Sequence, residues 1–259
     1  MCHETPDTDD ACKQGCALVT GAGSGIGRAI AISLSDARWP VVLMGRRRDC
    51  LESTAQAMPA DAAICVGDVR SRQDVATAIE AAESMGRLSL LVNNAGIMPI
   101  APAVTACLDD WKDTIDVNVH GVLNTIAAAL PLMRSHGSGH IVNISSVAGR
   151  AAFPAATVYS ASKAALDMIS EGVRGELSAA HLKNGPAIRV TSIAPGAVST
   201  ELPNSIRDPE VRAGTEAYYS SMSHPLTPED VARAVQFAVD SPPHVNINEI
   251  VIRPVEMSR

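Results

Sequence analysis

A glycine-rich segment between a predicted strand and a predicted helix constrains the fold more than any other part of the sequence. Residues 16–20 are apolar and predict a short strand, and residues 21–27 follow directly with the sequence Gly-Ala-Gly-Ser-Gly-Ile-Gly. Residues 28–36 then carry apolar side chains at helix-compatible positions. Glycines permit a tight turn, and a helix N-terminus offers free N–H groups to an anion. The segment therefore predicts a phosphate-binding loop, the alternative being a glycine-rich loop without a ligand.

The alternation of strand and helix continues along the chain. Six further strands are predicted, at 41–44, 62–66, 88–92, 141–144, 188–193 and 247–252. Helices are predicted at 28–36, 49–57, 71–84, 107–134, around Tyr159 and Lys163, and at 228–240; we expect Pro131 to kink or end the fourth. Repeated β-α-β units with apolar strands predict an α/β fold, with a parallel sheet covered by helices on both faces.

Composition and charge exclude several classes of protein. The chain is 46% hydrophobic, which suffices for a large core, and its net charge of −7 argues against a nucleic-acid partner. No secretory signal and no apolar run of ~18 residues is visible, so we expect a cytoplasmic protein without a membrane partner. The six cysteines lack metal-like pairing, so no metal site is predicted. Residues 1–15 are polar and acidic and predict a disordered leader before a single domain, 16–259.

Polar or glycine-containing segments follow five of the predicted strands. They are 21–27, Asp68, 93–96, Ser145 with Ser146, and Pro195 with Gly196. In an open parallel sheet, ligands bind outside the carboxyl ends of the strands. Segments far apart in the sequence are therefore expected to form one site at one edge of the sheet.

Tyr159 and Lys163 form a candidate catalytic pair. They lie four residues apart, so on a helix they share one face. An ammonium group beside a phenol favours the ionised form, which makes the phenol a stronger acid. A serine hydroxyl at the end of the preceding strand can polarise a carbonyl oxygen. These groups predict a site for proton exchange with a ketone or alcohol; the alternative is a surface pair and a simple turn.

Together these motifs closely resemble the short-chain dehydrogenase/reductase family in its compact one-domain form, over about residues 16–254. The resemblance implies a three-layer, doubly wound Rossmann fold with a mostly parallel seven-stranded sheet. It also implies a catalytic tetrad of Asn118, Ser146, Tyr159 and Lys163. In that scheme Lys163 binds the nicotinamide ribose and lowers the pKa of Tyr159, which exchanges a proton with the substrate oxygen. Ser146 stabilises the oxyanion, and Asn118 holds a water linked to Lys163.

The resemblance also implies contacts to a dinucleotide cofactor, among them Asp68 and Val69 at the adenine ring and Pro195 and Gly196 beside the nicotinamide. Together with the two arginines discussed next, the expected cofactor-binding residues are Gly21, Ser24, Gly25, Ile26, Arg46, Arg47, Asp68, Val69, Asn94, Ala95, Gly96, Tyr159, Lys163, Pro195, Gly196, Val198 and Thr200.

The end of the second strand favours NADP(H) as the cofactor. An acid there would bind the ribose 2′-hydroxyl and repel a 2′-phosphate, but residues 44–48 read Met-Gly-Arg-Arg-Arg. A guanidinium group can pair with a phosphate bidentately. Arg46 is the first candidate and Arg47 the second, whereas Arg48 is expected only to start a helix. Against this, Ser24 stands where many NADP-preferring relatives carry a further basic residue.

The loop 197–226 is expected to cover the substrate as a lid. It carries Leu202, Ile206, Tyr218, Tyr219 and Met222, with prolines that break regular structure. The opposite wall is expected to come from Val147, Arg150, Phe153 and Val158. Such an apolar lid suits an uncharged ketone, the alternative being that its side chains pack only against the core. Arg150 is left open between an anionic substrate and solvent.

Three functions are compatible with these features. The first is NADPH-dependent reduction of a ketone or aldehyde, as in carbonyl reductases; residues 246–254 resemble the branch that contains clavulanate-type, hydroxy-acid and carbonyl reductases. The second is NADP-dependent oxidation of a 3-hydroxy acid or its thioester. The third is a non-catalytic nucleotide sensor, which the complete tetrad disfavours. The resemblance also implies a homotetramer that pairs the helix before Arg134 and the Tyr159 helix with those of a neighbour.

Overall fold

A computed structural model describes residues 15–105 and 107–257, and its centre is one parallel sheet. The seven strands run in the order β3-β2-β1-β4-β5-β6-β7, and every neighbouring pair is parallel. This confirms the predicted α/β fold. The strands are β1 Cys16–Thr20, β2 Val41–Gly45, β3 Ala62–Val66, β4 Leu88–Asn93, β5 Ser138–Ile144, β6 Ala187–Pro195 and β7 Glu249–Ile252.

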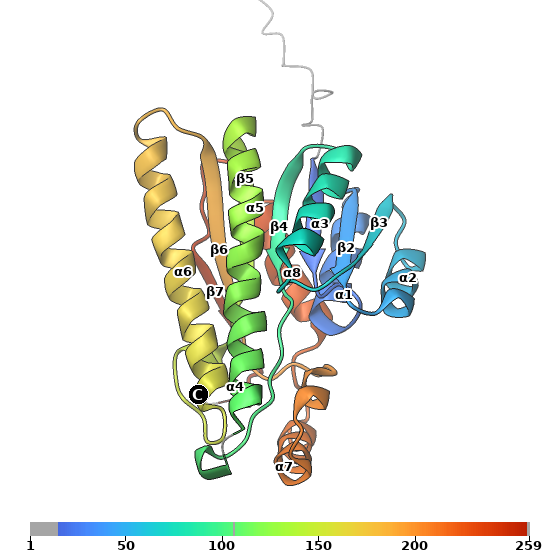
Figure 1. The fold of residues 1–259 in the computed structure, drawn as a ribbon, viewed down its shortest axis with the longest axis vertical. Coiled ribbons are helices and arrows are strands. Elements are labelled where there is room, and N and C mark those ends of the chain that lie inside the picture. Colours follow the sequence, from blue (N-terminus) through green and yellow to red (C-terminus); the bar gives the residue numbers. More distant parts are fainter. Residues whose placement is uncertain (1–14, 106, 258–259) are drawn as a thin grey trace, which may run out of the picture.

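Helices cover both faces of the sheet (Figure 1). They are α1 Gly25–Asp36, α2 Arg48–Gln56, α3 Arg72–Met85, α4 Leu108–Ile115, α5 Gly121–His136, α6 Thr157–His181, α7 Pro209–Ser220 and α8 Pro228–Val239. One core lies between the sheet and α3, α5 and α6, with Leu91, Met133 and Leu166 at its centre. The other lies between the sheet and α1 and α8, with Leu34, Leu43 and Val235. The two cores make three layers.

The strand order determines where along the carboxyl edge of the sheet a ligand can bind. The chain runs outward from β1 to β3, then crosses back so that β4 pairs with the other side of β1. At such a switch point the loops after the two central strands turn to opposite faces and leave a crevice between them. The glycine segment follows β1, and Asn94 follows β4. The two segments therefore flank that crevice.

Two of the observed helices contain prolines at which the sequence predicts a break or a kink. The lid was expected to lack regular structure, but α7 begins at Pro209, with the Asp208 carboxylate capping the N–H groups of Glu210 and Val211. Proline suits the first position of a helix, where its missing N–H is not needed. Pro131 lies inside α5, which continues to His136 and ends at Gly137 with φ of 82°. Of the two effects expected of Pro131, ending the helix was wrong, and a kink stays a prediction.

The remaining predicted boundaries lie within about three residues of the observed ones, apart from one helix. The helix expected at 107–134 is three elements, because the π-helix Asp116–His120 separates α4 from α5. The last strand starts two residues later than expected, at Glu249. The leader predicted at 1–15 lies outside the described residues except for residue 15. The stretch Leu108–His136 is apolar and long enough to span a membrane, though the same composition occurs in core helices.

A buried chain of side-chain hydrogen bonds joins two strands to two helices. Thr125 of α5 donates to Asn93 Oδ1 at 2.6 Å, and Asn93 Nδ2 donates to Asn143 Oδ1 at 2.8 Å. Asn143 Nδ2 donates to Ser170 Oγ of α6 at 2.8 Å, and Ser170 donates to the Leu166 carbonyl. Buried polar groups are costly unless they are paired. The chain therefore fixes α5 and α6 relative to β4 and β5.

We predict that Ser170→Ala lowers the free energy of unfolding by about 1–3 kcal/mol, since it leaves the amide of Asn143 buried without its acceptor. The matched control is Ser135→Ala. Ser135 also donates to a carbonyl of its own helix, but it is exposed and bonds no other element; its loss is expected to stay within about 0.5 kcal/mol. Urea unfolding measures both, and equal losses would contradict the role of the chain.

Candidate active site

One cavity of about 850 Å³ runs along the carboxyl edge of the sheet. Every residue expected to contact the cofactor lines it, and so do Ser146, Tyr159 and Lys163 of the tetrad. Asn118 is the exception: it does not line the cavity and is 1% exposed. The topology therefore brings the segments that follow five strands to one place. The volume lies within the range of small-molecule and cofactor sites.

The glycine loop is tightly closed against the loop that follows β4. Gly21 adopts φ of 65°, which favours glycine. A Cβ on Gly27 would lie 2.2 Å from the Gly21 carbonyl oxygen and 2.4 Å from Asn94 Nδ2, so no larger residue fits there. Asn94 Nδ2 donates to the carbonyls of Thr20 at 3.0 Å and Gly21 at 3.3 Å. Asn94 thus holds the glycine loop in place by hydrogen bonds and also lines the cavity.

The N-terminus of α1 opens into the cavity behind this loop. Ser24 is its N-cap residue, yet its side chain makes no capping hydrogen bond. Within the described helix, the first turn carries no acidic side chain. Unbonded N–H groups and the positive end of the helix dipole therefore face the cavity without a protein anion to neutralise them. This end of the cavity suits a phosphate-bearing ligand.

Charged side chains gather at the same end. Arg47 Nη2 lies 3.2 Å from Ser24 Oγ and 3.4 Å from a carboxylate oxygen of Glu201. Asp68 is held by Arg70, with contacts of 3.1 and 2.8 Å, and this hydrogen bonding lowers the pKa of the Asp68 carboxyl. Arg48 instead points along α2, where it pairs with Glu52 at 3.7 Å. Arg46 and Arg47 line the cavity and Arg48 does not.

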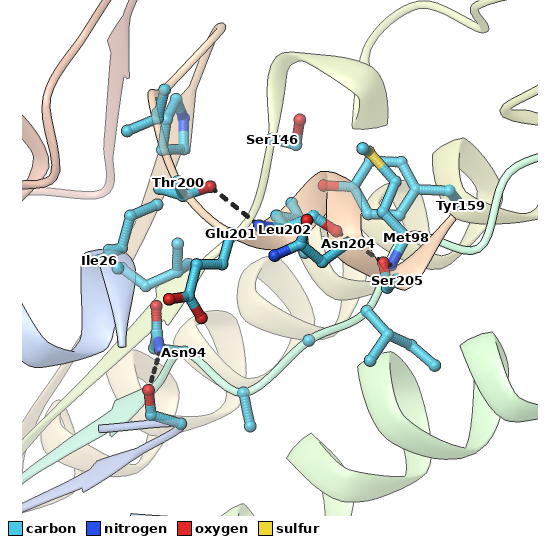
Figure 2. A pocket seen from close by; sticks show the side chains of 18 of the residues that line it. Ile26, Asn94, Met98, Ser146, Tyr159, Thr200, Glu201, Leu202, Asn204 and Ser205 are labelled. Atoms are coloured by element: carbon cyan, nitrogen blue, oxygen red, sulfur yellow. Dashed lines mark hydrogen bonds between the residues drawn. The ribbon is translucent and has the colours of Figure 1, made fainter. Parts of the chain in front are cut away.

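The other end of the cavity carries the catalytic candidates. Ser146 follows β5, and its Oγ accepts the Ala148 N–H at 3.1 Å, so its own hydrogen is available to another acceptor. Tyr159 and Lys163 lie one turn apart on α6 and are 8% and 6% exposed. Lys163 Nζ lies 5.9 Å from the centre of the Tyr159 ring and donates to the Ile144 carbonyl at 2.8 Å. Figure 2 shows Ser146 and Tyr159 at the rim of the same space.

Burial, rather than the neighbouring charge, governs the acidity of this pair. Desolvation raises the pKa of Tyr159 well above its ordinary value, and the Ser146 hydroxyl opposes that shift. The ammonium group of Lys163 donates to the Ile144 carbonyl, and the lowering of the Tyr159 pKa by Lys163 stays a prediction. Burial also lowers the pKa of Lys163 to about 8, while the Asp167 carboxylate opposes the shift. In this structure, therefore, the tyrosine hydroxyl keeps its proton at neutral pH.

Asn118 lies in the π-helix between α4 and α5, behind the cavity wall. Its Oδ1 accepts the Ile97 N–H at 2.9 Å, and its Nδ2 donates to the Ile97 carbonyl and to Ser162 Oγ, both at 3.0 Å. Both amide hydrogens are therefore donated to protein groups. The side chain ties the loop after β4 to α6, one residue before Lys163. The water-holding role implied by the resemblance stays a prediction.

Gly96 keeps the space between Asn118 and Lys163 open. A Cβ at this position would lie 3.3 Å from Asn118 Oδ1 and 3.7 Å from Lys163 Nζ. Lys163 Nζ has three hydrogens, and among the described residues only the Ile144 carbonyl accepts one. A buried ammonium group with unused donors beside an open cavity suits a ligand rich in hydroxyl oxygens. The N-terminus of α1, at the other end of the cavity, can bind the phosphates of such a ligand. Together with Lys163 it fits a nicotinamide dinucleotide.

The substrate end is mostly apolar, and sequence reasoning found only part of it. Leu202, Tyr218 and Tyr219 of the lid line the cavity, and so do Val147 and Phe153 of the opposite wall. Ile206, Met222 and Val158 do not; Ile206 is fully buried in a small core with Met98 and Tyr159. Arg150 forms an ion pair with Glu249 of β7 and is not directed to the cavity. Among the lining residues that the sequence did not single out are Met98, Ile100, Asn204, Ser205, Thr215 and Met257.

The lid is fixed at two further points. The Met98 N–H donates to Ser205 Oγ at 2.9 Å, which joins the lid to the loop after β4 (Figure 2). Arg207 lies 2.6 Å from Asp110 and 3.1 Å from Asp113, both on α4. The Asp110 side chain is only 9% exposed, so its charge is held largely by this arginine. These contacts therefore attach the lid to the loop after β4 and to α4.

The Lys163 pKa predicts a pH dependence of stability. Between pH 8 and ~10.4 the unfolded chain keeps a proton that native Lys163 has lost, so this residue contributes more to the free energy of unfolding as pH rises. Relative to Lys163→Met, the wild type should gain about 1–2 kcal/mol between about pH 8 and 9.5 in urea unfolding. The exposed control, Lys183→Met, should follow the wild type. A wild-type curve parallel to that of Lys163→Met would contradict the burial of this charge.

Comparison with known proteins supplies the context of this site. The family model described as short chain dehydrogenase matches residues 15–211. An uncharacterized oxidoreductase of Staphylococcus aureus strain MW2 is 40% identical over 241 residues, which cover 92% of this chain and 96% of the relative.

Solved structures agree in fold. The closed form of a serine dehydrogenase complexed with NADP⁺ is 34% identical with a TM-score of 0.86, covering 94% of this chain and 96% of that one. A short chain dehydrogenase/reductase from Burkholderia phymatum in complex with NAD is 26% identical with a TM-score of 0.82, covering 92% and 88%. The expected motifs, the fold and these matches agree: the chain belongs to the short-chain dehydrogenase/reductase family and is an oxidoreductase of that type.

Proposed function

We propose that this protein reduces an uncharged ketone or aldehyde to an alcohol with NADPH. The observation that carries the proposal is the polarity of the cavity. One end has the α1 N-terminus with Arg46 and Arg47, and the other brings Ser146, Tyr159 and Lys163 against apolar walls. A dinucleotide bound along the cavity would supply the hydride. The protein then has to bind the carbonyl group and deliver a proton.

The side chains divide that work. The Ser146 hydroxyl can donate its hydrogen to the carbonyl oxygen, while its own oxygen accepts the Ala148 N–H. Such a donor stabilises the negative charge that develops on this oxygen. Tyr159 keeps its proton at neutral pH and is the proton donor. Lys163 holds a positive charge beside the ring that becomes phenolate, while Asn118 fixes the loop opposite it.

The absence of a cation at the substrate end favours a neutral substrate. Among the described residues that line the cavity, Lys, Arg and His are represented only by Arg46, Arg47 and Lys163. The arginines lie at the cofactor end, and Arg150 is paired with Glu249. A substrate carboxylate would be desolvated with little compensation. Oxidation of a 3-hydroxy acid remains the second candidate, because a serine dehydrogenase is a relative of known structure.

The preference for NADP(H) over NAD(H) is part of the proposal. It is supported by the two arginines that follow β2 and by the absence of an acid within residues 44–48, whereas Ser24 stands where many NADP-preferring relatives carry a further basic residue. One relative of known structure is bound to NADP⁺ and another to NAD, so family membership alone does not decide it.

We also propose a homotetramer, as the family resemblance implies. In support, α5 and α6 lie side by side on one face of the sheet (Figure 1), and Leu123 and Met168 on them are 42% and 65% exposed. Exposed apolar groups on adjacent helices suit burial against a second copy. Light scattering on the purified protein measures the assembly. The cytoplasmic location and the lack of nucleic-acid or membrane partners stay predictions.

Removing the Tyr159 hydroxyl should abolish turnover while the cofactor still binds. We expect Tyr159→Phe to lower kcat for ketones by at least about 10²-fold, since the proton donor is lost. NADPH affinity, measured by fluorescence titration, should change little. Tyr218→Phe, at the other wall of the cavity, is the control and should keep most of the rate. Substantial activity in Tyr159→Phe would exclude the mechanism, and cofactor binding without turnover of any carbonyl or alcohol by the wild type would favour a nucleotide sensor.

The cofactor preference should depend on the two arginines that line the cavity. Arg46→Ala and Arg47→Ala are each expected to raise KM for NADPH about tenfold with little change for NADH, since each removes a charged partner of the 2′-phosphate. Arg48→Ala is the matched control, because Arg48 pairs with Glu52 and does not line the cavity. Initial rates with both cofactors test this. A wild type with higher kcat/KM for NADH would contradict the preference.

A further inference from the structure

Glu201 lies where the cofactor end of the cavity meets the lid. It follows Thr200, a predicted cofactor contact, and precedes the short 3-10 helix Leu202–Ser205. One carboxylate oxygen lies 3.4 Å from Arg47 Nη2, and the same nitrogen lies 3.2 Å from Ser24 Oγ. Figure 2 shows this carboxylate pointing away from Tyr159, toward the side of the pocket where Ile26 and Asn94 lie. A negative charge from the lid therefore stands against the phosphate end of the site.

The ion pair with Glu201 occupies the Arg47 guanidinium group, which a 2′-phosphate would need as a partner. Arg47 follows β2, and the Ser24 hydroxyl, which has no capping role, lies 3.2 Å from it in the loop after β1; both groups can donate to a phosphate. A phosphate that binds Arg47 either replaces the Glu201 carboxylate as its acceptor or lies within a few ångströms of a second negative charge. Either arrangement costs free energy that a cofactor without this phosphate does not meet.

From this arrangement we propose that Glu201 competes with the 2′-phosphate of the cofactor for Arg47, and thereby sets how strongly the enzyme prefers NADP(H) over NAD(H). The inference rests on the proposed function, in which Arg47 is part of the 2′-phosphate site. Glu201 is thus a specificity-determining residue whose effect opposes that of Arg46 and Arg47. The two arginines favour NADP(H) over NAD(H), and Glu201 weakens that preference.

The exposure of the pair makes the exchange feasible. The side chains of Arg47 and Glu201 are 58% and 60% exposed, and ion pairs this exposed are weak. A phosphate monoester carries nearly two negative charges and more acceptor oxygens than a carboxylate, so it is the stronger partner. Glu201 also lines a second, smaller recess of about 280 Å³ with Arg28 in its wall. A released carboxylate can turn toward that second guanidinium group.

The test uses two adenylate fragments, so that it reports binding without turnover. Isothermal titration of the full chain gives Kd for 2′,5′-ADP, which carries the phosphate, and for 5′-AMP, which lacks it. Glu201→Gln should tighten 2′,5′-ADP about three- to tenfold and leave 5′-AMP within about twofold. The gain should shrink at high salt, because the groups are exposed. No change for 2′,5′-ADP, or an equal gain for both fragments, would overturn the proposal.

A matched control and a double variant isolate the competition. Glu52→Gln likewise removes a carboxylate that pairs with an arginine of residues 46–48. That arginine is Arg48, which lies outside the cavity, so Glu52→Gln should bind both fragments as the wild type does. In an Arg47→Ala background, Glu201→Gln should tighten 2′,5′-ADP less than it does in the wild type, since only direct repulsion remains. An equal gain in both backgrounds would show that Glu201 acts by general repulsion, which contradicts competition for Arg47.

The two proposals fail in different ways. If the wild type binds 2′,5′-ADP no more tightly than 5′-AMP, and Arg47→Ala changes neither, the assignment of Arg47 to a 2′-phosphate site is wrong. If Arg47→Ala weakens 2′,5′-ADP but Glu201→Gln leaves it unchanged, the site stands and the competition is wrong.

Discussion

The active site depends on a buried chain of hydrogen bonds that the sheet and its helices cannot form separately. Asn93 and Asn143 face each other across β4 and β5, and their amides continue into Thr125 of α5 and Ser170 of α6. Every group in the chain is paired only in one relative placement of these four elements. Since Tyr159 and Lys163 lie on the same helix as Ser170, the placement of these two side chains against the end of β5 follows from that constraint.

The cavity has a cationic end and a largely apolar, buried end. At one end, the α1 N-terminus and two arginines favour negative charge. At the other, burial raises the pKa of Tyr159 and lowers that of Lys163, so burial disfavours the charged form of each group. A ligand with phosphates at one end and a neutral ring at the other matches both. Glu201 departs from this division, because it brings an acid from the lid to the cationic end.

The fold and most of the site were predictable from the sequence because both follow from short-range patterns. Apolar strands alternating with helices predict a parallel sheet, and the parallel sheet predicts which edge binds ligands. The predictions that failed, and the contacts that were missed, depend on neighbouring side chains that a short-range pattern does not include. Pro209 starts α7 because Asp208 caps that helix. The contact between Arg47 and Glu201 joins residues 154 positions apart, and no local pattern marks it.

The acidity of Tyr159 shows most clearly what spacing cannot give. Four-residue spacing does place Lys163 beside the ring, yet the effect of a charge depends on where its side chain is directed and how deeply both groups are buried. Here the ammonium group is bonded to the Ile144 carbonyl, and desolvation dominates. A buried phenol that keeps its proton is suited to donate it to a carbonyl oxygen, whereas alcohol oxidation would first require its removal. The burial of the pair therefore sets the protonation state from which Tyr159 would act in either direction of the reaction.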